Sequence, residues 1–131
     1  MKNIEKICVA IHLFTGLGAL AGGAAAISDP LKPLGLEAAQ ALQYSPFDNF
    51  FIPGLLLFGI IGLGNLYAAL SFFRNIKLKF FISGFFASAL IIWIIVQCIM
   101  LRTVIALQVI FFIIGTIQGL LALFLLHKRY D

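Results

Sequence analysis

Charged residues are scarce in this sequence and nearly absent from its long apolar runs. They make up 11% of the chain, against 63% hydrophobic residues. A chain of this size with so few charges cannot cover a water-exposed surface, which excludes a soluble globular domain. The basic residues that give the net charge of +4 lie at the ends of the apolar runs, where lipid headgroups would be. We therefore expect membrane lipid as the surroundings and no nucleic-acid partner.

Aspartate and glutamate are absent from all the long apolar runs. A proton- or cation-coupled transporter normally needs a carboxylate within the membrane, so a small proton-driven drug pump is not expected. The sequence also lacks a Ser/His/Asp set, a metal-binding motif and a phosphate-binding glycine loop. We expect neither a cofactor nor a metal, and the sequence leans away from an enzyme.

Only two cysteines are present, Cys8 and Cys98. They fall near opposite ends of their runs, about 25 Å apart in depth at 1.5 Å per helical residue. A disulfide between them is therefore excluded, and both are expected to be packing residues.

The apolar runs number four, and each is long enough to cross a hydrocarbon core of about 30 Å as a helix of roughly 20 residues. They cover residues 7–27, 50–73, 80–100 and 104–126. The sequence thus predicts an all-α, antiparallel four-helix transmembrane bundle that forms one domain over residues 1–131.

The basic residues are distributed unequally between the two sides of such a bundle. Seven lie on the side of both termini and two on the other, which predicts cytoplasmic termini. We expect a multi-pass protein of a bacterial cytoplasmic (inner) membrane. The seven are Lys2, Lys6, Arg74, Lys77, Lys79, Lys128 and Arg129, and the two are Lys32 and Arg102.

The first run also resembles a secretory signal, because a basic start precedes it and Ala24-Ala25-Ala26 could be a cleavage site. At some 20 residues it exceeds the roughly 7–15 of a typical signal core. We expect it to remain as the first helix.

The first connection, residues 28–49, is expected to be extracytoplasmic. Residues 36–43 are strong helix formers and predict a short interfacial helix. Ser45 is suited to an N-cap position, with Pro46 in the first turn of the second helix. Pro53 cannot donate to the carbonyl of residue 49, which predicts a kink near the membrane surface.

Glycines concentrate on helix faces, where they would allow close backbone approach. Packing within the bundle and a homodimer seam both fit this pattern. The glycines in question are Gly18 and Gly22, Gly59 and Gly62, and Gly115 and Gly119.

Polar side chains within the runs are the main functional clue, because each needs a partner or a wet cavity. His12, Asn65 and Gln118 all fall roughly 20 to 22 Å below the outer boundary, with Ser88 and Thr15 near 18 Å. This layer predicts either a hydrogen-bonded clasp or a small polar cavity in which His12 could titrate.

A second polar set, Gln97 with Gln108, lies about 5 Å below the outer boundary. Trp93 is one turn before Gln97 and needs a partner for its indole N–H. These three residues form a candidate outer pocket. On the outer face, Arg102 is expected to pair with an acid of the first connection, Asp48 in particular.

The segment Ser45-Pro46-Phe47-Asp48-Asn49-Phe50-Phe51-Ile52-Pro53-Gly54, with Trp93-x-x-x-Gln97 and Gln108, resembles small uncharacterised four-pass membrane proteins of bacteria. These share an SPF-x-x-F-x-IPG turn, and the resemblance implies the fold but no activity. A looser likeness to DoxX-like proteins, in pass count and in the glycine-rich first helix, implies quinone or redox chemistry.

Two functions follow from these patterns. One is a non-enzymatic interaction or accessory protein, acting as a homo-oligomer or with another membrane protein. The other is a binder of a lipid or quinone-like molecule that enters between the second and third helices. A ligand-sized cavity at Trp93, Gln97 and Gln108 would favour the binder, and tightly closed helices would favour the accessory protein.

Overall fold

The computed structural model is helical almost throughout the residues that it describes. These exclude residues 1–2, 33–39, 41, 44, 103–105 and 131, and for residues 106–107 and 129–130 only the backbone is described. Four of the helices are long and apolar enough to cross a membrane, as the sequence predicts. They are α1 (Asn3–Ser28), a second helix made of α3 (Phe51–Leu56), η2 (Leu57–Leu63) and α4 (Gly64–Phe73), then α5 (Lys79–Leu101) and α6 (Ala106–Tyr130).

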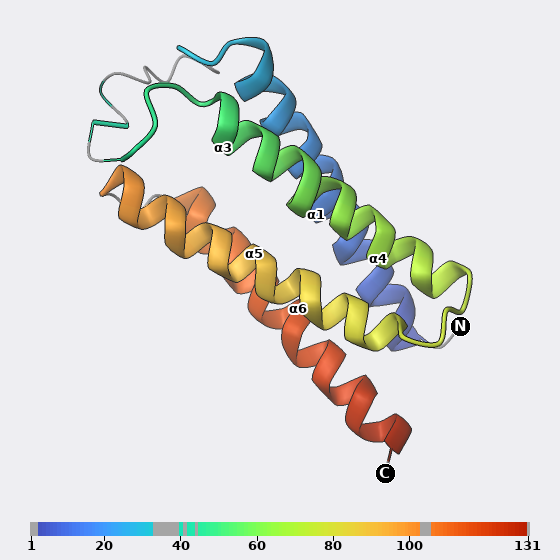
Figure 1. Cartoon of the computed structure of the whole chain (residues 1–131). Helices are drawn as coiled ribbons and strands as arrows, with labels where there is room; N and C mark the ends of the chain where they lie inside the picture. The colour runs from blue at the N-terminus through green and yellow to red at the C-terminus, as the bar shows by residue number, and fades with distance from the viewer. Residues whose placement is uncertain (1–2, 33–39, 41, 44, 103–105, 131) are drawn as a thin grey trace.

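The two termini lie at the same end of the molecule (Figure 1). We call this the termini end; the turn from α4 to α5 is also there. The opposite end, where α1 gives way to the segment before α3 and where α5 is followed by α6, is called the far end.

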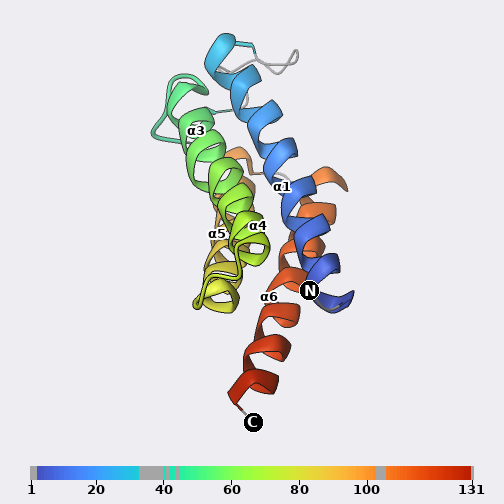
Figure 2. The same cartoon turned by 90° about the vertical axis from the view of Figure 1, so that its right-hand side faces the viewer.

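The helices are arranged as two pairs (Figures 1 and 2). The second helix packs along α1, and α6 packs along α5. Near the termini end α4 also contacts α5, whereas α3 packs mainly on α1. The pairs therefore meet at the termini end and separate toward the far end.

Glycines bring α1 and the second helix into close contact. A Cβ atom on Gly23 would lie 2.7 Å from Cβ of Phe58, and one on Gly54 would lie 2.6 Å from Cβ of Ala26. Neither position has room for a larger residue, so the backbones approach closely there.

The predicted glycine faces are only partly correct. Gly62 packs against Leu20, but a Cβ on Gly59 would meet nothing within 4 Å. Gly18 and Gly22 line a cavity, although a Cβ on Gly22 would also lie 3.3 Å from Cδ2 of Leu57 in the second helix. Their spacing identified a helix face correctly but did not tell which neighbour that face meets.

The second helix begins later than its predicted N-cap. Ser45 makes a local turn in which its hydroxyl accepts a hydrogen bond from the N–H of Phe47 at 3.2 Å. The first N–H of α3, on Phe51, donates to Oδ1 of Asn49 at 2.9 Å. The N-cap role assigned to Ser45 is therefore wrong, because its side chain is already engaged in the turn. The interfacial helix expected over 36–43 lies mostly outside the described residues.

Pro53 does not interrupt the second helix, and the predicted kink stays a prediction. It lies in the first turn of α3, where a missing N–H is tolerated. The irregular part comes one turn later, in η2, which is wound as a π-helix over Leu57–Leu63. π-Helical turns are rare in proteins overall, and those that do occur are often found at functional sites.

Candidate functional site

The largest fully buried side chains of the described chain are polar, and most of them meet at one level. We call this set the polar cluster; its members are His12 and Thr15 of α1, Asn65 of α4, Ser83 of α5 and Gln118 of α6. Each has at most 1% of its surface exposed. All four membrane-crossing helices thus contribute to one buried polar layer.

His12 is held at both ring nitrogens. Its Nδ1 is 2.7 Å from Oδ1 of Asn65, and its Nε2 is 2.6 Å from Oγ of Ser83. The amide nitrogen of Asn65 donates to the carbonyl of Ile61 at 2.7 Å, so Oδ1 of Asn65 must accept from His12. We assign the neutral imidazole with its proton on Nδ1 and with Ser83 donating to Nε2.

Gln118 completes the layer from α6. Its Nε2 donates to Oγ1 of Thr15 at 3.3 Å and to Oδ1 of Asn65 at 3.4 Å. The 3.4 Å approach of Nε2 to Nδ1 of His12 brings two donors together in the assigned tautomer, so we do not count it as a hydrogen bond. Oε1 of Gln118 is buried and has no hydrogen-bond partner in the part of the chain that the structure describes.

The predicted polar layer is present for His12, Asn65, Gln118 and Thr15, but Ser88 does not belong to it. Ser88 is exposed, and its hydroxyl donates to its own helix at the carbonyl of Gly84, 2.9 Å away. Ser88 was assigned to the polar layer from its depth alone. A residue of this layer must also lie on the helix face that points into the bundle.

Ser83 takes the place expected for Ser88, and the sequence does not distinguish the two because α5 is apolar on every face. The buried residues of α5 as far as Ile94 recur at alternating steps of three and four, as in a heptad stripe. Ser83 lies on this stripe and Ser88 does not. The stripe is Phe80, Ser83, Ala87, Leu90 and Ile94.

A buried ion pair closes the termini end and was not predicted. Nζ of Lys79 lies 2.7 Å from Oε1 of Glu5, and the two side chains are 12% and 8% exposed. Nζ also donates to Oδ1 of Asn75 at 2.8 Å. The rings of Phe72 and Phe80 lie 5.7 and 5.2 Å away, within cation–π range.

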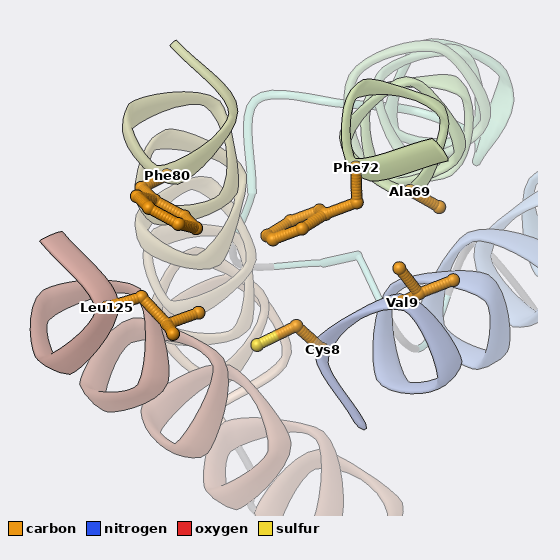
Figure 3. Close-up of a cluster of buried hydrophobic side chains, with 6 residues drawn as sticks. All are labelled: Cys8, Val9, Ala69, Phe72, Phe80 and Leu125. Carbon is orange, nitrogen blue, oxygen red and sulfur yellow. The ribbon is translucent and has the colours of Figure 1, made fainter. Parts of the chain in front are cut away.

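An apolar cluster lies between the ion pair and the polar cluster (Figure 3). Cys8 of α1, Phe72 of α4, Phe80 of α5 and Leu125 of α6 point toward one another there. Cys8 is 1% exposed and is a free thiol that packs as a small apolar residue. The termini half of the bundle is therefore filled by side chains from all four helices.

The far half contains a partly open cavity instead. Its volume is about 330 Å³, and all four membrane-crossing helices contribute to its wall. It begins at Thr15, a member of the polar cluster, and continues past Gly18, Gly22 and Ala26 of α1. This is where the two helix pairs separate, and Leu42 and Phe50, from the segment before α3, also line it.

The three residues of the predicted outer pocket line this cavity together: Trp93, Gln97 and Gln108. The indole N–H of Trp93 is buried without an acceptor among the described residues, which costs about 1–3 kcal/mol. Oε1 of Gln108 accepts from the Cys98 thiol at 3.5 Å. Since the remaining lining residues other than Thr15 are apolar or glycine, the cavity has few polar groups.

The outer-face ion pair stays a prediction. Arg102 ends α5 as its C-cap, with a left-handed backbone at φ 50°. Asp48 lies in the segment before α3. Elsewhere, no group of three or more His, Cys, Asp or Glu suited to a metal occurs among the described residues.

Comparison of this chain with protein-family models, with curated proteins and with solved structures finds no match.

Proposed function

We propose that this membrane protein binds a small apolar or amphiphilic molecule, such as a lipid or a quinone-like compound, in the far-half cavity. The observation that carries the proposal is the cavity itself. Its volume of about 330 Å³ lies at the low end of the roughly 300–1,000 Å³ typical of small-molecule sites. An apolar wall with a few polar groups is the usual composition of such sites.

The contrast between the two halves of the bundle supports this proposal. The termini half is closed by the ion pair and the polar cluster, each of which joins different helices. Because these contacts join all four helices, we infer that the polar cluster acts as a clasp. A bundle that served only as packed scaffolding would be expected to close along its whole length.

The accessory-protein role was expected to go with tightly closed helices. The separation of the two pairs at the far end favours the binder, because it leaves ligand-sized space inside the bundle. Ligand entry between α3 and α5 fits this arrangement, because α3 packs mainly on α1.

We also propose an orientation and a cellular location for the protein. The termini end would face the cytoplasm of a bacterial cell, and the far end would face the periplasm. The support is the unequal distribution of seven against two basic residues. The ligand would then enter from the outer leaflet.

Native mass spectrometry of protein extracted in mild detergent tests the proposal. Ala19 is buried and lines the cavity, so Ala19→Leu places three further carbons in it. Ala24 is exposed on the same helix and does not line the cavity, which makes Ala24→Leu the matched control.

We expect the unmodified protein and Ala24→Leu to carry a small molecule and Ala19→Leu to have lost it. A wild-type protein that carries no small molecule, or an Ala19→Leu protein that keeps it in full, would argue against a binding role.

A further inference from the structure

We propose that the ligand of the cavity is an electrically neutral molecule that carries a hydrogen-bonding head and an apolar tail. Its head would lie toward the far end, between Gln97 and Gln108, and its tail would extend toward Thr15. This inference rests on the proposed binding function and adds the chemical class and the orientation of the ligand.

The described wall of the cavity disfavours a charged ligand. Every lining residue in the described part of the chain is apolar, glycine or neutral polar, so none of these carries a charge. Arg102, directly after the lining residue Leu101, is exposed and is not part of the wall. A carboxylate or ammonium group brought into this space would lose its water and gain no counter-ion.

Apart from Thr15 at the floor, the polar residues of the described wall lie on α5 and α6. Gln97 lies one helical turn beyond Trp93 on α5, toward the far end, and Gln108 lies near the start of α6. A carboxamide can both donate and accept, so two of them suit a hydroxyl, ester, amide or ketone. The amide of Gln97 makes no hydrogen bond within the described part of the chain, which leaves it available to a ligand.

The remaining length of the cavity is suited to a hydrocarbon tail. Along α1 the wall runs from Ala26 to Thr15, which is about 16 Å at 1.5 Å per residue. Leu90 and Ile61 line the part nearest the polar cluster. At the floor, the hydroxyl of Thr15 is already used as an acceptor by Gln118. A polar head would therefore find more hydrogen-bonding groups at the far end than at the floor.

The single tryptophan of the chain, Trp93, makes a direct test possible because it lies in the cavity wall. The full-length protein is placed in phosphatidylcholine nanodiscs and titrated with ω-bromooctanol, ω-bromooctanoate or bromooctane. The three probes share a chain and a bromine that quenches tryptophan fluorescence, and they differ only in the head. Titrations are carried out at a pH at which the carboxylate is ionised.

We expect saturable quenching by ω-bromooctanol at a concentration at least about tenfold lower than for ω-bromooctanoate. In Gln97→Leu the alcohol should bind no better than bromooctane. In Gln97→Lys the carboxylate should gain affinity relative to the alcohol, because the wall then carries a cation. Thermal unfolding of each variant shows whether the protein is folded.

Equal binding of the alcohol and the carboxylate to the wild-type protein would overturn the inference while leaving a binding cavity. If only bromooctane binds saturably, the inference about a polar head is likewise overturned, although a binding cavity remains. If none of the three probes quenches Trp93 saturably, the proposed binding function itself fails.

Discussion

At the scale of single residues, His12 holds three helices together. It joins α1 to Asn65 of α4 and to Ser83 of α5, and both contacts are short and fully buried. Hydrogen bonds between membrane helices contribute about 0.6 to 2 kcal/mol each. Since His12 does not line the cavity, its role can be separated from ligand binding.

His12→Leu should therefore lower the thermal stability of the protein in detergent by roughly 1–3 kcal/mol, because Asn65 and Ser83 each lose a buried partner. Any ligand retained by the wild-type protein should still be retained. Ser88→Ala is the control, since Ser88 is exposed and bonds only its own helix. A thermal melt with native mass spectrometry measures both properties. An equal shift in the two variants would refute the clasp.

The ion pair between Glu5 and Lys79 leads to a second prediction at the scale of single residues. Lys79→Met removes a nearly buried cation and leaves Glu5 without this partner, which should destabilise the protein by about 3 kcal/mol. Lys77→Met, at an exposed position two residues away, should change the melting temperature far less. Glu5→Leu combined with Lys79→Met should recover part of the loss, because no charge is then left buried. A double variant less stable than both single variants would contradict this account.

At the scale of elements, the seam between α1 and the second helix depends on glycine. Gly23→Ala would place a methyl group 2.8 Å from the backbone nitrogen of Phe58, so the helices must move apart. We expect a loss of about 1–3 kcal/mol. Gly59→Ala has no neighbour within 4 Å and should be neutral or slightly stabilising. Chemical or thermal unfolding of the two variants compares them directly. A Gly23→Ala protein as stable as wild type would show that the seam tolerates separation.

The elements themselves could be predicted well from the sequence. The length of each apolar run is dictated by membrane thickness, so four runs gave four helices with ends close to those observed. The start of the second helix was placed too early, because Ser45 could form a local turn as well as an N-cap.

The candidate site was predicted only in part, because counting residues along a helix gives the depth of a side chain but not the direction in which it points. Depth follows from residue number, which brought His12, Asn65 and Gln118 to one level. Rotation about the helix axis also depends on the neighbouring helices, so Ser88 was chosen over Ser83. The Glu5–Lys79 pair was missed although both residues flank their runs at the same end, because charges there were counted only for orientation.

At the scale of the whole molecule, the distribution of basic residues leads to a test of orientation. Lys32 and Lys77 are both exposed and fall on opposite sides of the bundle. A cysteine at position 32 should react with an impermeant thiol reagent in intact cells, whereas one at position 77 should react only after lysis. Cys8 and Cys98 are internal controls, because the unsubstituted protein measures their background. The reverse pattern of labelling would place the termini outside the cytoplasm.

The polar cluster also has a consequence for how the chain is made. During synthesis α1 enters the membrane first, when His12 has neither of its partners. Asn65 arrives with the second span and Ser83 with the third, so the imidazole is satisfied at both nitrogens only once α5 is inserted. A truncated chain that ends at residue 78 and is released from the ribosome should therefore remain prone to extraction from the bilayer or to degradation. A released chain that ends at residue 101 should be better retained, because the histidine then has both of its neighbours.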